Sequence, residues 1–242
     1  GQGRGRRQAM SGRAATDMPR SPGQLVLDLP HRPALGRDDF IVTATNHAAV
    51  AAIDRWPDWP HHALIVTGPA GSGKSPLAAV WCQKTGAAIV DANDLKMGRV
   101  PALLASGCLV VEAVDRRGID EQALFHAFNL VREQGGFLLM TARDEVSGWS
   151  VSLNDLRSRL RATPVAQLGA PDDLLLKAVL IKLFADRQLA VSAPLVDYLV
   201  RRMERSLEAA ARIVEELDRA ALASNRPLSR ALATEVLKAG SP

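Results

Sequence analysis

One short segment, residues 68–75, constrains the fold of this chain more than any other: it reads Gly-Pro-Ala-Gly-Ser-Gly-Lys-Ser. Its glycines, lysine and last serine fit the pattern of a loop that binds phosphate, with five strand-like residues before it and a helix-forming segment after it. Glycines let the backbone wrap closely around phosphate, and the free amides at the start of a helix donate hydrogen bonds to it. A chance glycine-rich loop is the alternative, but the flanking strand and helix favour a nucleotide site.

Two residues of this loop have a predictable chemistry. Lys74 is expected to neutralise the β- and γ-phosphates, and Ser75 is expected to supply a ligand for magnesium. Pro76 departs from the usual pattern, because its position normally donates a backbone amide to the α-phosphate and proline has none. Proline is tolerated in the first turn of a helix, so the fold is kept while one phosphate contact is lost. The expected nucleotide-binding residues are Ile41, Val42, Gly68, Pro69, Ala70, Gly71, Ser72, Gly73, Lys74, Ser75 and Pro76.

Composition narrows the classes of protein to be considered. The chain has 242 residues, of which 47% are hydrophobic, enough for a substantial core in one large domain or two small ones. Its formal net charge is +4, but residues 1–20 contain five arginines and one aspartate, so the rest of the chain is neutral. A basic tail is weak evidence for nucleic-acid binding by the folded body, and we expect no direct sequence-specific DNA binding. Cys82 and Cys108 have neither metal-ligand spacing nor a disulfide framework, so both are expected to be reduced core residues.

The chain shows no signal for a membrane. No segment is apolar over the roughly 18 residues that a membrane-spanning helix requires, and the basic tail lacks the apolar core of a signal peptide. We therefore expect a soluble cytoplasmic protein without membrane contacts.

The first 30 residues divide into a tail and a peptide. Residues 1–23 are predicted to be a disordered basic tail because Gly, Arg, Ser and Pro dominate them, and whether the whole tail is native is left open. Residues 24–30 read Gln-Leu-Val-Leu-Asp-Leu-Pro, either a short edge strand or an extended peptide that inserts alternate side chains into another protein's pockets. The peptide resembles the Gln-Leu-x-Leu-x-Leu form by which bacterial proteins bind the DNA-polymerase sliding clamp. The candidate clamp-binding residues are Gln24, Leu25, Leu27 and Leu29.

Between residues 31 and 169, apolar runs alternate with helical segments. The clearest helix between them is expected at 121–134. This alternation predicts an α/β domain whose parallel sheet is covered on both faces, with the site in the loops at the carboxyl ends of the strands. The five strands are expected at 63–67, 86–91, 108–112, 136–141 and 164–168.

One strand is predicted to deliver a carboxylate to this site. Glu112 ends the apolar run 108–111, and beside a phosphate-binding loop such a carboxylate suits magnesium held through water. An ordinary strand-terminal acid is the alternative. The next position normally holds the acid that activates water in ATPases, and here it is Ala113. Without that general base, ATP hydrolysis by this chain alone should be slow, because Asp115 lies two residues further on at a different spacing.

From residue 170 to residue 242 the pattern becomes helical throughout. It predicts a small α-helical lid domain that follows the α/β domain. The helices are expected at 171–189, 193–203, 207–223 and 229–238.

Taken together, these features resemble the AAA+ ATPases of the DnaA branch, and most closely the Hda (HdaA) family, which has that module without the DNA-binding domain of the initiator. The resemblance covers about residues 24–238, through the clamp-like peptide, the loop, the segment 155–160 and the helical lid. It implies that the arginine of the Ser-Arg-Leu triplet, Arg159, is a finger that reaches into a neighbouring subunit's nucleotide site. Such a guanidinium stabilises charge that develops on the γ-phosphate in the transition state. An arginine-rich solvated turn, with Arg157 and Arg161 beside Arg159, is the alternative.

The chain also departs from the AAA+ pattern. Thr141 lies where a polar sensor is expected and would serve only weakly. The lid's sensor arginine aligns with Glu208, while Arg205 and Arg212 lie one turn away on either side, and Arg212 is the candidate nucleotide contact. These departures indicate a site that retains nucleotide, and the resemblance implies ADP, or else ATP, with magnesium.

Two classes of function therefore compete. The first is a negative regulator of replication initiation, in which an ADP-bound adaptor on the sliding clamp presents Arg159 to DnaA and stimulates its ATP hydrolysis. The second is a self-contained ATPase or DNA-remodelling subunit such as a helicase loader. The missing general base and the neutral body favour the regulator. Its expected partners are the clamp and DnaA, with self-association a further option, in the bacterial cytoplasm beside the nucleoid and replisome.

Overall fold

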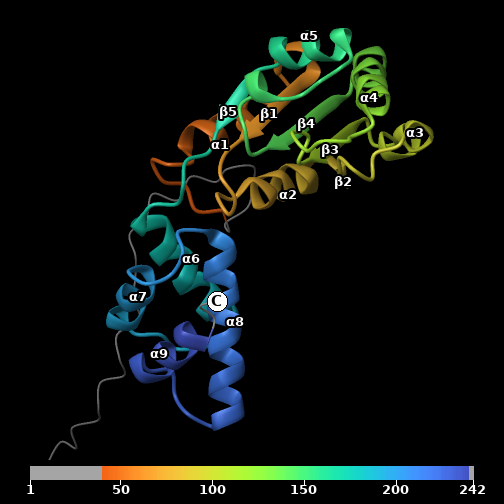
Figure 1. Ribbon diagram of the computed structural model, residues 1–242. Helices are drawn as coiled ribbons and strands as arrows, with labels where there is room; N and C mark the ends of the chain where they lie inside the picture. The colour runs from red at the N-terminus through yellow and green to blue at the C-terminus, as the bar shows by residue number, and fades with distance from the viewer. Residues whose placement is uncertain (1–39, 240–242) are drawn as a thin grey trace, which may run out of the picture.

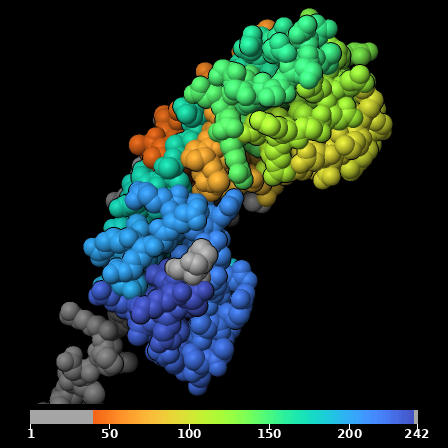
Figure 2. Space-filling model, viewed as in Figure 1, coloured from red at the N-terminus to blue at the C-terminus, as the bar shows by residue number. Residues whose placement is uncertain are grey.

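The computed structural model of the chain describes residues 40–239. The predicted tail 1–23 and the clamp-like peptide 24–30 lie outside the described residues. Within the described range, an α/β part built on one sheet is followed by a helical part that extends from it (Figure 1). The space-filling view shows that the two parts touch where the orange segment after the first strand meets the blue helices (Figure 2).

The sheet is parallel throughout and has five strands in the order β2-β3-β4-β1-β5. This confirms the predicted fold class. The strands are β1 (Ala63–Thr67), β2 (Ala88–Asp91), β3 (Cys108–Glu112), β4 (Phe137–Ala142) and β5 (Val165–Gln167). Because helices cover both faces, the central strands are apolar on both sides rather than alternating, and every residue of β1 is buried.

Two apolar layers hold the sheet between helices. On one face, side chains of β1, β3 and β4 pack against α3 (Val100–Leu103), α4 (Glu121–Gln134) and α5 (Asn154–Ala162). On the other face, the intervening side chains of the same strands pack against α1 (His47–Asp54) and α2 (Lys74–Thr85). Three short 3-10 helices complete the connections: η1 (Pro60–His62), η2 (Met97–Arg99) and η3 (Val146–Gly148).

An aromatic cluster fixes α2 against this second face. The rings of Trp59 and Trp81 stack, with centroids 5.2 Å apart and planes 22° apart. Trp56 meets Trp81 edge-on at 6.4 Å, and Phe137 at the start of β4 contacts both Trp56 and Trp59. Pairs of this geometry stabilise a core beyond the area they bury, so α2 is held firmly from its carboxyl half.

The helical part consists of α6 (Asp173–Asp186), α7 (Ala193–Val200), α8 (Leu207–Ser224) and α9 (Arg230–Ala239). Its helices surround a third apolar cluster, to which Phe184, Leu199 and Val214 contribute fully buried side chains. Side-chain caps begin three of the helices: the Asp172 carboxylate accepts a hydrogen bond from the Leu175 amide, the Ser206 hydroxyl oxygen accepts one from the Ala209 amide, and the Ser229 hydroxyl oxygen accepts one from the Leu232 amide. Among residues 40–239, no helix combines the length and the apolar character that a membrane crossing needs.

Candidate functional site

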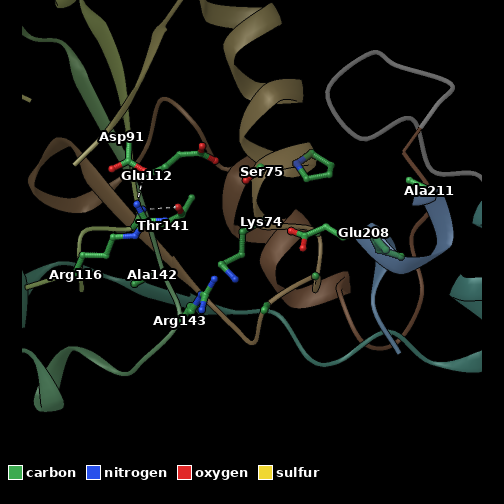
Figure 3. A pocket seen from close by; sticks show the side chains of 16 residues that line it. Lys74, Ser75, Asp91, Glu112, Arg116, Thr141, Ala142, Arg143, Glu208 and Ala211 are labelled. Atoms are coloured by element: carbon green, nitrogen blue, oxygen red, sulfur yellow. Dashed lines mark hydrogen bonds and ion pairs between the residues drawn. The ribbon is translucent and has the colours of Figure 1, made fainter. Parts of the chain in front are cut away.

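A pocket of about 340 Å³ lies at the carboxyl edge of the sheet, where α2 and α8 both begin; we call it the loop pocket (Figure 3). The glycine-rich loop after β1 forms one wall, and the ends of β2, β3 and β4 form another. The first turn of α8 closes a third side. Its lining residues are Ala70, Gly71, Gly73, Lys74, Ser75, Pro76, Asp91, Glu112, Ala113, Arg116, Thr141, Ala142, Arg143, Leu207, Glu208 and Ala211.

The loop curls around the ammonium group of Lys74. The Lys74 Nζ donates hydrogen bonds to the Gly68 carbonyl at 2.7 Å and to the Pro69 carbonyl at 2.8 Å. Burial lowers the pKa of Lys74 most, the nearby Arg143 guanidinium lowers it further, and the carboxylates of Asp115, Glu208 and Glu112 oppose that change. The ammonium group therefore lies in a partly desolvated position, where an anion is attracted strongly.

The helical part α6–α9, the predicted lid, contacts the phosphate-binding loop directly at Gly71. The Leu207 amide, at the start of α8, donates a hydrogen bond to the Gly71 carbonyl at 2.8 Å. Gly71 has a φ of 67°, and a Cβ added there would lie 2.2 Å from the Ser206 Cβ, so only glycine fits. Two helix amino termini, those of α2 and α8, thus border the same pocket, and their dipoles favour negative charge within it.

Glu112 fits the role of a carboxylate near magnesium. Its Oε1 is buried and has no hydrogen-bond partner among the described residues, although a carboxylate in that position needs one. Ser75, in the first turn of α2, is exposed and lines the same pocket. Magnesium is bound by one or two carboxylates or hydroxyls together with phosphate oxygens and water, so Ser75 and Glu112 would hold it beside a bound nucleotide. The neighbouring Asp91 instead pairs with Arg116 at 2.8 Å.

The residues that directly follow Glu112 in the chain add no carboxylate to the lining of the loop pocket. Ala113 has a φ of 57°, and its amide donates a hydrogen bond to the Thr141 Oγ1 at 3.2 Å, which leaves the Thr141 hydroxyl proton for another acceptor. The Asp115 carboxylate accepts hydrogen bonds from the amides of Arg143 and Asp144 at 2.8 and 3.0 Å. Asp115 therefore shapes the loop after β4, and it does not line the loop pocket.

Several of the expected nucleotide contacts lie outside the lining of the loop pocket. Gly68, Pro69 and Ser72 form the loop behind it, and Ile41 and Val42 precede α1. Arg212 lies one turn beyond Glu208 and shares a hollow of the lid with Glu216, four residues further along the same face of α8.

Arg205, the other basic residue of the lid considered for the sensor role, also lies outside the lining of the loop pocket. Arg205 pairs with Asp173 at 2.8 Å. Glu208, where the resemblance expects an arginine, lines the loop pocket.

Arg159 lies in a separate hollow of about 660 Å³, which has no lining residue in common with the loop pocket. Its guanidinium is half-buried and lies over the Phe125 ring, 4.8 Å from the ring centroid. The neighbouring arginines differ from it: the Arg157 guanidinium donates hydrogen bonds to the Val151 carbonyl, whereas Arg161 is exposed. Of the three arginines, Arg157 has a structural role and Arg159 is aimed into a cavity.

Three charged residues of the loop pocket were not expected from the sequence: Asp91, Arg116 and Arg143. Asp91 ends β2 beside Glu112 in the sheet register, so a strand-terminal acid at the carboxyl edge was a usable signal. The two arginines lie in loops, and nothing in their sequence neighbourhood indicates that these loops turn toward the phosphate-binding loop.

Comparisons with known proteins rest on structure alone. No protein-family model matches the sequence, and no curated protein sequence matches it. The structure is similar to domain III of the replication initiation protein DnaA from Thermotoga maritima, with a TM-score of 0.67 and 18% identity over 87% of this chain and 98% of that one. The chain has a DnaA-like AAA+ fold.

Two further solved structures extend this similarity. An AMPPCP-bound DnaA from Aquifex aeolicus matches with a TM-score of 0.58 and 15% identity over 76% of this chain and 63% of that one. The RuvB Holliday junction branch migration motor of Thermotoga maritima matches with a TM-score of 0.60 and 17% identity over 74% and 61% of the two chains. At such identities the likeness establishes the fold, while function has to be argued from the residues.

Proposed function

We propose that this chain is a negative regulator of replication initiation that acts on DnaA. In this proposal it holds ADP and magnesium in the loop pocket and docks on the polymerase sliding clamp through Gln24, Leu25, Leu27 and Leu29. It then presents Arg159 to ATP-bound DnaA and stimulates DnaA to hydrolyse its bound ATP. Such a regulator acts in the bacterial cytoplasm, at the replisome.

The observation that carries this proposal is the position of Arg159. Its guanidinium lies in a hollow that the chain's own phosphate-binding loop does not reach. It forms no ion pair with any other residue of the range 40–239. An arginine finger acts on the nucleotide of a neighbouring subunit, and a partly desolvated guanidinium without a carboxylate partner is suited to a phosphate.

The chemistry of the loop pocket supports nucleotide retention rather than turnover. Ala113 offers no general base, the Asp115 Oδ2 accepts two backbone amides outside the lining of the pocket, and Glu208 occupies the expected position of a sensor arginine. Binding of an adenine nucleotide is supported by the likeness to an AMPPCP-bound DnaA and by the loop itself. ADP is the proposed resident, because the negative charge of Glu208 in the pocket lining disfavours the additional charge of a γ-phosphate.

The test is the turnover of ATP-loaded DnaA in the presence of this protein, the clamp and DNA. Changing Arg159 to Ala should leave folding, ADP binding and clamp binding intact. It should lower the stimulated rate of ATP hydrolysis by DnaA by roughly 10³-fold, the lower end of what an arginine finger contributes. Lysine should rescue poorly, because it lacks the planar fork of the guanidinium. Arg161→Ala is the matched control, since it removes an exposed arginine from the same helix and should leave stimulation unchanged.

Other outcomes would point elsewhere. If Arg159→Ala and Arg161→Ala lower stimulation equally, the effect is one of general charge and the finger assignment is wrong. Rapid ATP hydrolysis by this chain alone, abolished by Lys74→Ala, would favour the self-contained ATPase or helicase-loader class instead.

A further inference from the structure

An arginine that the sequence did not single out lies beside the phosphate-binding lysine. Arg143 follows β4 directly and lines the loop pocket with an exposed side chain. In Figure 3 its guanidinium and the Lys74 ammonium group point toward one another across the mouth of the loop. The proximity is also evident in the pKa of Lys74, which the Arg143 charge lowers.

The backbone fixes this arrangement from both sides. The Gly68 amide donates a hydrogen bond to the carbonyl of Ala142, the residue before Arg143, at 3.2 Å. The Gly68 carbonyl accepts the bond from the Lys74 Nζ at 2.7 Å. The Arg143 amide is in turn held by the Asp115 carboxylate at 2.8 Å. The Lys74 ammonium group is therefore bonded to Gly68 directly, and the backbone that leads into Arg143 is bonded to the same glycine through Ala142.

Two like charges in one partly desolvated pocket repel each other, and an anion between them relieves that repulsion. The other arginine of the pocket, Arg116, is paired with Asp91, whereas Arg143 forms no ion pair with any residue of the described part of the chain. Arginine presents a fork of donors that matches phosphate oxygens, so its free guanidinium beside Lys74 is suited to a phosphate group.

We propose that Arg143 is a second cationic ligand, beside Lys74, for the phosphates beyond the α position of the bound nucleotide. Arg143 supplies, from the same chain, the phosphate-binding cation that the lid does not supply. In the lid, Glu208 lines the pocket where an arginine is expected, and Arg212 lies in another hollow. The inference rests on the proposed nucleotide-binding function and names the residue that makes the site selective for di- and triphosphates over monophosphates.

The experiment measures the affinity of the purified full chain for ADP, ATP and AMP by calorimetry. Arg143→Ala should weaken the binding of ADP and ATP by about tenfold or more, as expected for the loss of a charge-assisted hydrogen bond, and should leave AMP binding unchanged. Arg143→Lys should recover part of the loss. Arg117→Ala is the matched control, because Arg117 is also exposed, on a neighbouring loop, but does not line the loop pocket.

The outcomes separate the two proposals. If the wild-type chain binds ADP and Arg143→Ala binds it equally well, the role of Arg143 is overturned while the nucleotide site stands. Equal weakening of ADP, ATP and AMP would likewise overturn it, since that pattern indicates a general effect on the site. A wild-type chain that binds no ADP overturns both.

Discussion

Ala113 shows how a single position decides what this pocket does to its ligand. It follows the last residue of β3, its backbone adopts a φ of 57°, and it lines the loop pocket at the position where ATPases normally carry an acid. The hydrogen bond from the Ala113 amide to the Thr141 Oγ1 fixes that backbone, so a longer side chain placed at this position would leave the backbone in the same direction. Alanine at this position already has the conformational free-energy cost of a left-handed backbone, so replacing it with another non-glycine residue raises that cost little.

Our prediction at this position is a gain of activity. The wild-type chain should hydrolyse ATP slowly, and Ala113→Glu should raise its magnesium-dependent turnover about 100-fold, the lower end of what a positioned general base contributes. Phosphate release measures the rate. Ala113→Gln is the control, because it has the same size without a carboxylate, and Lys74→Ala should abolish the gain. Equal rates in the Glu and Gln variants would show that the base is not what limits hydrolysis.

Individual site residues were predictable from the sequence to different extents. Lys74 lies within a recognisable loop, and Glu112 and Thr141 lie at the ends of apolar runs, so their arrival at one sheet edge follows from strand order. Arg143 was not predictable, because the direction of its loop depends on a carboxylate 28 residues earlier in the chain, that of Asp115. Arg212 was expected near the nucleotide, but its distance along α8 brings it to a different hollow.

At the scale of elements, the contact between α8 and the phosphate-binding loop couples the lid to the site. The hydrogen bond from the Leu207 amide to the Gly71 carbonyl and the close approach of Ser206 join two segments more than 130 residues apart in sequence. A change at this contact should therefore affect both stability and ligand binding.

Gly71→Ala tests that coupling. The added Cβ would lie 2.2 Å from the Ser206 Cβ on a backbone with a φ of 67°, so the variant should lose about 2 kcal/mol of stability and melt roughly 5 °C lower. ADP affinity should fall with it, because the lid is displaced from the pocket. Gly98→Ala is the control, since a Cβ there meets nothing within 4 Å and should leave both quantities nearly unchanged. A Gly71→Ala variant that melts and binds like the wild type would show that the lid yields easily.

The elements themselves were largely predictable, and the discrepancies have local causes. The strand 63–67 was predicted with its observed bounds because its apolar run is uninterrupted. The second strand was predicted from residue 86 but begins at Ala88, because Gly86 adopts a φ of 71° and terminates α2. The short helix α3 was not predicted, since four residues are too few to show a helical period.

At the scale of the whole molecule, the proposed function requires three separate surfaces to act together. The loop pocket and the hollow around Arg159 have no lining residues in common, and the clamp-like peptide precedes the described residues. A change in one surface should therefore leave the other two intact, which makes the regulator proposal testable part by part.

The clamp-binding peptide gives the clearest such test. Replacing Gln24 and Leu25 by alanine should weaken clamp binding about tenfold or more, because each buried leucine contributes roughly 1.5 to 3 kcal/mol before ordering costs. ADP affinity should not change. Asp28→Ala serves as the control, since Asp28 occupies an unspecified position of the pattern. Loss of the whole fold in the double variant, or unchanged clamp binding, would show that the peptide is a strand of the body.

The aromatic cluster behind α2 has a practical consequence for all of these measurements. Three of the four tryptophans, Trp56, Trp59 and Trp81, lie in that cluster, and Trp81 is on the helix that begins with Lys74. The emission of stacked indole rings depends on their separation and on the water around them. The intrinsic fluorescence of the unlabelled protein therefore reports the packing of the helix that carries the phosphate-binding lysine.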